Sequence, residues 1–161
     1  MKSMTLDAID RKILKYLVKN ARMPYLEIAR ECGISGAAIH QRIHKLTEAG
    51  VIQGSYLVVN PKLLGYDVCA YINISVKEPQ LLNETIEELK KVPEVVEAHF
   101  ISGKGNIQAK LYCVDNEHLM RTIFDNVLRI EGIAATETNI SLQEAFSRPL
   151  DLELLSQEEP R

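Results

Sequence analysis

The first third of the chain carries three stretches whose apolar residues recur at helical spacing. In residues 6–20 the apolar positions fall three and four apart, with lysines on the other sides, which predicts an amphipathic helix. A second helix is predicted over residues 24–32, because Gly33 then permits the backbone that ends it. A third is predicted over residues 36–49, since Ser35 belongs to the residue types that cap helices. Three helices with a tight turn between the last two are typical of a helix-turn-helix.

The third predicted helix has two faces of different character. Its apolar stripe, Ile39, Ile43 and Leu46, indicates packing on the other two helices. The opposite face spans an arc of about 140° and is small and hydrogen-bonding rather than acidic. Its residues are Gly36, Ala37, His40, Gln41 and His44. Such a face suits the major groove of duplex DNA, with Arg42 and Lys45 beside it at the level of the phosphates. The alternative interpretation is the solvated face of an ordinary helix.

The same helix raises the question of a metal site. His40 and His44 stand four residues apart, which is also a spacing of zinc ligands, and Cys32 is near in sequence. A closed site needs three or four ligands, and no carboxylate or further Cys or His follows nearby. DNA contact by neutral imidazoles explains the pair with fewer assumptions, so we expect no metal.

The hydrophobic period changes after residue 53. β-branched residues in 54–60 predict a short strand, and Pro61 with Gly65 indicates a hinge into a second unit. Strict alternation over residues 68–76 then predicts a strand with one face on a core. The elements that follow are a helix around residues 82–89, strands over 95–101 and 107–114, a helix over 116–130 and a last strand over 133–142.

The order β-α-β-β-α-β has one compact solution with right-handed crossovers. It is a ferredoxin-like sandwich of four antiparallel strands with both helices on one face, so the whole chain is predicted to be an α+β protein. We expect the uncovered sheet face to be an apolar patch that a second copy of the chain covers. The predicted organisation is a DNA-binding domain over 1–60, a ferredoxin-like domain over 61–143 and an acidic tail over 144–161.

Composition narrows the class of protein without naming its activity. The 161 residues are 46% apolar and 25% charged, which excludes collagen and low-complexity chains. The formal net charge of −3 conceals an asymmetry: residues 1–60 hold 9 Lys and Arg against 5 Asp and Glu, net +4, whereas residues 61–161 hold 10 against 17, net −7. A basic front on an acidic back indicates that only the first third meets a polyanion.

The cysteines and the hydropathy of the chain indicate the cellular compartment in which we expect the protein. The chain has three cysteines, far apart and flanked by apolar neighbours, which favours buried thiols in a reducing compartment over disulfides. No apolar run approaches the roughly 18 residues that span a bilayer, and the charged start does not suit a signal peptide. We therefore expect a cytoplasmic protein without a membrane partner.

Several segments together resemble a known family. They are LDAIDRKILKYL, NARMPYLEIARECGIS, RIHKLTEAGVIQG, PKLLGY, VPEVVEAHFISGKGN and EGIAATETNISL. In this order, over residues 5–143, they resemble the leucine-responsive (Lrp/AsnC, or feast/famine) transcription regulators. The resemblance implies a winged helix-turn-helix followed by a ligand-sensing domain. It also implies dimers that assemble into octamers, and a small effector, usually an amino acid, bound between dimers.

The resemblance also assigns candidate residues. On the recognition helix it implies Ser35, Ala37, His40, Gln41, Arg42 and Lys45 as DNA contacts. In the effector loop the family reads Gly, any residue, an aromatic residue and then Asp, where this chain has Gly103, Lys104, Gly105 and Asn106. The last-strand motif of the family matches Thr136 and Thr138. The effector is expected to be an amino acid or a related carboxylate. Because Asn106 is neutral and Lys104 is a cation, we expect either weak binding of common amino acids or a preference for a ligand whose amino group is absent or modified. A plain β-hairpin turn is the alternative for the loop.

Two other functions compete with a ligand-responsive regulator. An enzyme would use the loop SGKGN, but it lacks the spacing of a phosphate-binding loop and leads into no helix. His99 and Ser102 lie three apart in a predicted strand, on opposite faces, and cannot act on one atom. We therefore expect no enzymatic activity and no cofactor. A DNA-architectural protein without effector response remains an alternative, because the same front domain would serve it.

Overall fold

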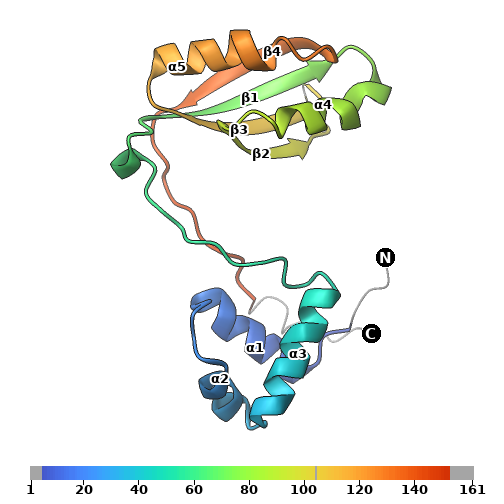
Figure 1. The fold of residues 1–161 in the computed structure, drawn as a ribbon, viewed down its shortest axis with the longest axis vertical. Coiled ribbons are helices and arrows are strands. Elements are labelled where there is room, and N and C mark those ends of the chain that lie inside the picture. The colour runs from blue at the N-terminus through green and yellow to red at the C-terminus, as the bar shows by residue number, and fades with distance from the viewer. Residues whose placement is uncertain (1–4, 104, 153–161) are drawn as a thin grey trace. The chain divides into compact units, whose positions relative to one another are not determined.

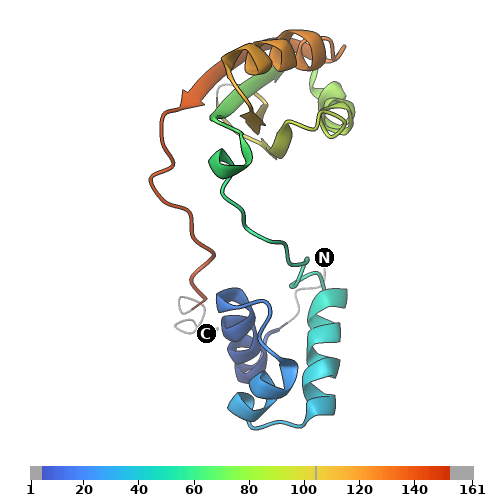
Figure 2. The same cartoon turned by 60° about the vertical axis from the view of Figure 1, so that its left-hand side comes forward.

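The computed structural model describes residues 5–103 and 105–152 of the chain. It divides into two compact units, with the boundary between Leu57 and Val58 (Figures 1 and 2). Of the described residues near the C-terminus, 146–152 group with the first unit. None of the helices in these described residues combines the length and the apolar character needed to cross a bilayer.

The first unit holds the three predicted helices, α1 (Ala8–Lys19), α2 (Tyr25–Cys32) and α3 (Gly36–Glu48). Their ends follow the local signals: the Asp7 carboxylate accepts the Asp10 N–H, and the Ser35 hydroxyl accepts the Ala38 N–H at 3.1 Å. Gly33 ends α2 at φ +68°, a conformation that costs an L side chain energy. Buried isoleucines from all three helices form the core of the unit, Ile13, Ile28 and Ile39 among them. The helix-turn-helix prediction is confirmed.

The predicted strand over residues 54–60 is wrong. Residues 52–60 form no regular element, and residues 53–60 are all exposed. A strand needs the backbone of a neighbouring strand for its hydrogen bonds, and no such neighbour lies beside this segment in the described chain. Its β-branched side chains therefore fit an extended conformation without a sheet. The short 3-10 helix Lys62–Leu64 follows, closed by Gly65.

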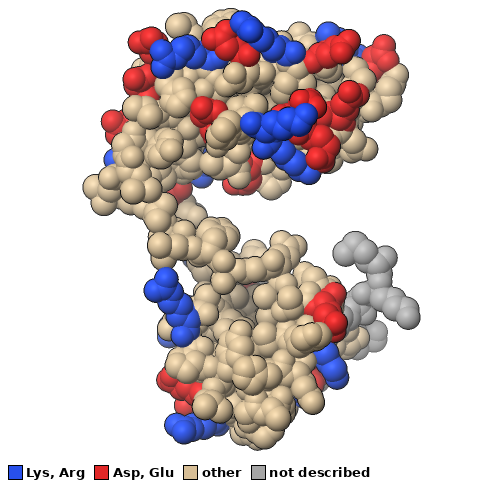
Figure 3. Space-filling model, in the orientation of Figure 1, with Lys and Arg blue, Asp and Glu red and all other residues tan. Residues whose placement is uncertain are grey.

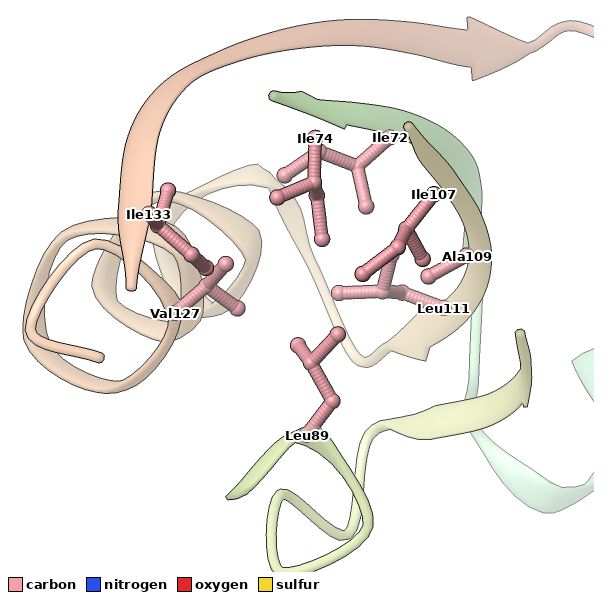
Figure 4. Packing of buried hydrophobic residues seen from close by; sticks show 8 residues of the cluster. All are labelled: Ile72, Ile74, Leu89, Ile107, Ala109, Leu111, Val127 and Ile133. Carbon is pink, nitrogen blue, oxygen red and sulfur yellow. The ribbon is translucent and has the colours of Figure 1, made fainter. Parts of the chain in front are cut away.

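The second unit is the predicted ferredoxin-like sandwich. Its strands are β1 (Val68–Val76), β2 (Val95–Phe100), β3 (Ile107–Cys113) and β4 (Ile133–Ser141). They form one antiparallel sheet in the order β2-β3-β1-β4. The helices α4 (Leu82–Leu89) and α5 (Asn116–Arg121) lie on one face of it (Figure 1). Figure 4 shows isoleucines and leucines of β1 and β3 directed toward Leu89 of α4 and toward Val127.

The second helix differs from its prediction as one α-helix over 116–130. After Arg121 the chain continues as a π-helix, Thr122–Val127, and the Leu128 N–H donates to the Ile123 carbonyl at 2.8 Å, five residues back. The wider turn brings both Thr122 and Val127 to the buried side of the helix. Periodicity alone did not indicate this change.

The uncovered sheet face is not the apolar patch that the sequence predicted. The β1 and β3 residues that alternate with the buried positions point to this face, and most of them are polar. They are Cys69, Tyr71, Asn73, Ser75, Gln108, Lys110 and Tyr112. Asn73 and Gln108 hydrogen-bond across it, with 3.1 Å between Oδ1 and Nε2. The Lys110 ammonium lies 5.2 Å from the ring centroid of Tyr112 and 5.8 Å from that of Tyr71. Burial lowers the pKa of Lys110, but hydrogen bonding and charge interaction with Tyr112 outweigh it, so the net pKa is raised.

Candidate DNA-recognition and effector sites

The face of α3 predicted to read DNA is solvent-exposed. Ala37, His40, Gln41, His44 and Lys45 are all exposed. The opposite stripe, with Ile39, is buried against the other helices. In the view of Figure 3 the first unit carries scattered charges of both signs rather than one continuous basic patch. The exposed residues of the α3 face are mainly hydrogen-bonding side chains, with Lys45 as the cation beside them.

The histidines of α3 have neighbours within the unit. His44 Nδ1 lies 3.1 Å from a carboxylate oxygen of Glu48, one turn on. The ring of His40 meets that of Tyr25 edge-to-face, with centroids 5.2 Å apart and an interplanar angle of 70°. Cys32 packs beside the core of the unit, whereas both histidines are exposed. Tyr25 was missed by the sequence analysis, because nothing in the periodicity relates it to His40.

Arg42 is held by two carboxylates of α1 and its cap. Its Nη1 donates to Asp7 Oδ2 at 2.6 Å and to Asp10 Oδ1 at 2.7 Å. Only 8% of the Asp10 side chain is exposed, against 29% for Arg42. The Asp10 backbone N–H and the guanidinium of Arg42 lower the pKa of Asp7, and the two carboxylates raise the pKa of Arg42. A phosphate contact by Nη1 would have to displace this internal pairing, so the structure gives Arg42 a role that the sequence did not indicate.

Only some of the predicted effector residues lie close together in the structure. Ile74 of β1 pairs with Ile107 on one side and with Thr136 on the other, so the loop before β3 lies level with Thr136. Gly105 and Thr136 line one pocket of about 240 Å³. Its other lining residues are Asn73, Ser75, Ala135 and Glu137. Gly103 is exposed, and Lys104 lies outside the described residues.

Both the side chain and the backbone of Asn106 form hydrogen bonds to β1. Its side-chain Oδ1 accepts the Val76 N–H at 2.9 Å, and its own backbone N–H donates to the Ile74 carbonyl at 2.8 Å. Gly105 before it has φ +89°, and an added Cβ would lie 3.3 Å from the Ile74 oxygen. The loop is thus fastened to the end of β1, and the Asn106 carbonyl that could have received an effector's ammonium group already accepts a backbone hydrogen bond.

Thr138 lies apart from the loop. It borders an apolar groove of about 450 Å³ between β4 and the last helix, where Met120 and Phe124 are exposed. Thr136 borders both this groove and the pocket of Gly105. The two threonines pair with Ile72 and Ile74, so they share the helix-covered face of the sheet.

Comparison with known proteins assigns the family. Residues 6–53 match the family model described as winged helix-turn-helix DNA-binding, and residues 69–150 match the Lrp/AsnC ligand binding domain. The chain belongs to the Lrp/AsnC family. It is similar to the regulatory protein AsnC of Haemophilus influenzae, with 35% identity over 145 residues, covering 90% of this chain and 97% of that one. The resemblance drawn from the sequence is thereby confirmed.

Solved structures of similar proteins have the same fold as this chain. The structure of Escherichia coli AsnC has a TM-score of 0.82 at 35% identity and covers 91% of this chain and 99% of its own. A transcriptional regulator of Neisseria meningitidis, solved as an L-Met complex, has a TM-score of 0.83 at 23% identity, covering 94% and 99%. At 23% identity, the similarity to the Neisseria meningitidis structure shows a shared fold only. The chain is therefore a transcriptional regulator with a DNA-binding and a ligand-binding domain, in a family of regulators rather than enzymes.

Proposed function

We propose that this Lrp/AsnC regulator binds duplex DNA sequence-specifically through α3 and that a small metabolite alters its DNA binding or its assembly. We assign DNA binding to residues 1–60 and sensing and assembly to residues 61–143, and we assign neither function to the acidic segment 144–161. The observation that supports the proposal best is the exposed, hydrogen-bonding face of α3. Side chains such as Gln41 can form paired hydrogen bonds with a base edge in the major groove.

A binding experiment on the full chain tests the DNA contact. Gln41→Ala should reduce preference at one base position by about 1–3 kcal/mol while leaving non-specific binding unchanged. Lys45→Ala should weaken binding to all duplexes and reduce the dependence of log K on log salt by about one unit. Lys19→Ala on α1 is the matched control for the loss of a lysine. Unchanged specificity in Gln41→Ala would remove that residue from the recognition surface.

The proposed effector is an amino acid or a related carboxylate. The pocket of Gly105 and Thr136 offers the Ser75 hydroxyl and the Asn73 amide, which can hydrogen-bond a carboxylate or an ammonium group. The structurally similar transcriptional regulator of Neisseria meningitidis was solved as an L-Met complex, which supports an effector of this class. Lys104, which precedes Gly105 in the sequence, is a candidate cation for a carboxylate.

Calorimetric titration of the full chain with the standard amino acids and their 2-oxo acids tests this site. Asn73→Ala and Ser75→Ala should each weaken the ligand that binds by about tenfold, the effect of losing one hydrogen bond to a charged group. Thr138→Val, outside the pocket but on the neighbouring strand β4, should leave the affinity unchanged. Equal affinities in all three variants would place the site elsewhere in the protein.

We further propose that the chain forms homodimers that assemble into octamers. The exposed sheet face carries two tyrosines around a lysine, and aromatic residues of this kind are enriched at interfaces. Light scattering on the full chain should report a dimer or a larger assembly. Tyr71→Asp should shift it toward the monomer, whereas Glu84→Lys on α4 should not. A wild-type monomer at micromolar concentration would contradict the proposal.

A further inference from the structure

Tyr25 lies beside the recognition surface without belonging to the recognition helix. It is the first residue of α2, and the residue is 36% exposed. The two helices approach closely here, since a Cβ added at Gly36 would lie 2.9 Å from Leu26 Cδ2. This approach brings the first turn of α2 next to the first turns of α3, where His40 projects. The two rings then meet edge-to-face at 5.2 Å, within the range that aromatic pairs prefer.

The contact bears on how His40 can read a base. An exposed side chain on a helix ordinarily exchanges among rotamers. The two ring nitrogens of a neutral imidazole are different, one a donor and the other an acceptor, so a rotated ring presents the wrong group to a base edge. A functional side chain is most selective when a neighbour fixes its rotamer before binding. Tyr25 is the neighbour that the structure provides, with a rigid side chain of few torsions.

We propose that Tyr25 is a positioning residue for DNA recognition: its ring holds the His40 imidazole in one orientation, and sequence preference at the base opposite His40 depends on it. The inference rests on the proposed function of α3. It concerns the aromatic ring of Tyr25 and not its hydroxyl, and it requires no contact between Tyr25 and DNA. It therefore predicts coupling between the two side chains rather than two independent contributions.

A double-mutant cycle on the full chain tests the inference. The probes are a duplex selected by the wild-type protein from a random library and a scrambled duplex of the same composition. His40→Ala and Tyr25→Leu should each reduce the preference for the selected duplex by about tenfold. The double variant should lose no more than His40→Ala alone. Tyr25→Phe, which keeps the ring, should behave as wild type, and binding to the scrambled duplex and its salt dependence should stay unchanged throughout.

The results for the two single variants distinguish failure of base reading by His40 from failure of the positioning role of Tyr25. If His40→Ala leaves the preference intact, His40 reads no base, and both the proposed role of His40 and the positioning role of Tyr25 fail. If His40→Ala reduces the preference but Tyr25→Leu does not, or the two losses multiply, the positioning role alone is overturned. Weaker binding of both duplexes by Tyr25→Phe, which removes only the hydroxyl, would make Tyr25 a direct DNA contact instead. Should Tyr25→Leu melt markedly lower than wild type, Tyr25→Met replaces it in the same cycle.

Discussion

The ion pair between Arg42 and α1 should contribute more to the stability of the DNA-binding unit than any exposed charge of α3. Removing the Arg42 side chain leaves Asp10 nearly buried, with 8% of its side chain exposed, and without a cation. Hydrogen bonds to charged groups contribute about 1.5–3 kcal/mol. Leaving a buried charge unpaired costs about 3–5 kcal/mol.

The expected cost of Arg42→Ala is about 2–3 kcal/mol. The upper range does not apply, because Asp10 still accepts the Asp7 backbone N–H at 3.3 Å and has an edge in solvent. Asp7 adds little, since about half of its side chain, 52%, is exposed and its pairing with Arg42 is screened by water. Urea unfolding of the full chain, followed by circular dichroism in the far ultraviolet, measures the change. Arg30→Ala, an exposed arginine of α2, is the control and should cost less than about 0.5 kcal/mol.

The pH dependence gives a second, independent readout. The folded pKa of Asp7 is lowered, first by the Asp10 N–H and then by Arg42. A carboxyl group with a lowered folded pKa stabilises the folded state above its unfolded pKa, and this stabilisation is lost as the pH falls through the folded value. The part of the difference between wild type and Arg42→Ala that depends on Asp7 should therefore be complete at pH 7 and shrink below about pH 4.

A cycle with Asp10→Ala completes the test. The two single variants should be coupled by about 1.5 kcal/mol or more, because each removes the same hydrogen bond. If Arg42→Ala costs no more than the Arg30 control, or if the losses simply add, the pairing does not hold α3 to α1. In that case Arg42 would be available to DNA, and its substitution should reduce the salt slope of binding by about one unit.

Further substitutions test other parts of the account. Gly132→Ala should destabilise the second unit by about 1–3 kcal/mol in urea unfolding, since its Cβ would lie 2.4 Å from Thr85 Oγ1; a neutral result would mean that this turn repacks freely. Asn106→Asp keeps the acceptor for the Val76 N–H, so it should fold normally and strengthen binding of amino acids over 2-oxo acids in calorimetry. No change in that ratio would exclude Asn106 from effector selection. Asn106→Ala loses the acceptor and should cost about 1 kcal/mol, which thermal melting would contradict if the variant melts as wild type does.

The helices and strands were predictable because their signals are local. Asp7, Ser35 and Gly33 mark helix ends through side-chain caps and a left-handed backbone, and each stands next to the element that it ends. β1 follows from strict alternation over residues 68–76 and has those same bounds in the structure. The segment 54–60 also contains β-branched residues, Val58 and Val59, but has no partner strand in the described chain. Composition favours an extended backbone, whereas a strand depends on what lies beside it.

The sites were predictable only as far as they lie on one element. The exposed face of α3 follows from its period, and the structure leaves the same face in solvent. The contacts that refine it join distant residues: Arg42 with Asp10, and Tyr25 with His40. Periodicity carries no information about such pairs, because they depend on how two helices pack. The use of Asn106 by the backbone of β1 is equally long-range.

The central claim is that α3 reads sequence in duplex DNA. The most direct measurement is in vitro selection of bound duplexes from a random library by the full chain, in parallel with Gln41→Ala and with the exposed α2 control Arg30→Ala. The wild type and the control should enrich the same motif, and Gln41→Ala should lose preference at a subset of its positions only. Enrichment of no motif by the wild type, or of one unchanged motif by all three proteins, would contradict the claim.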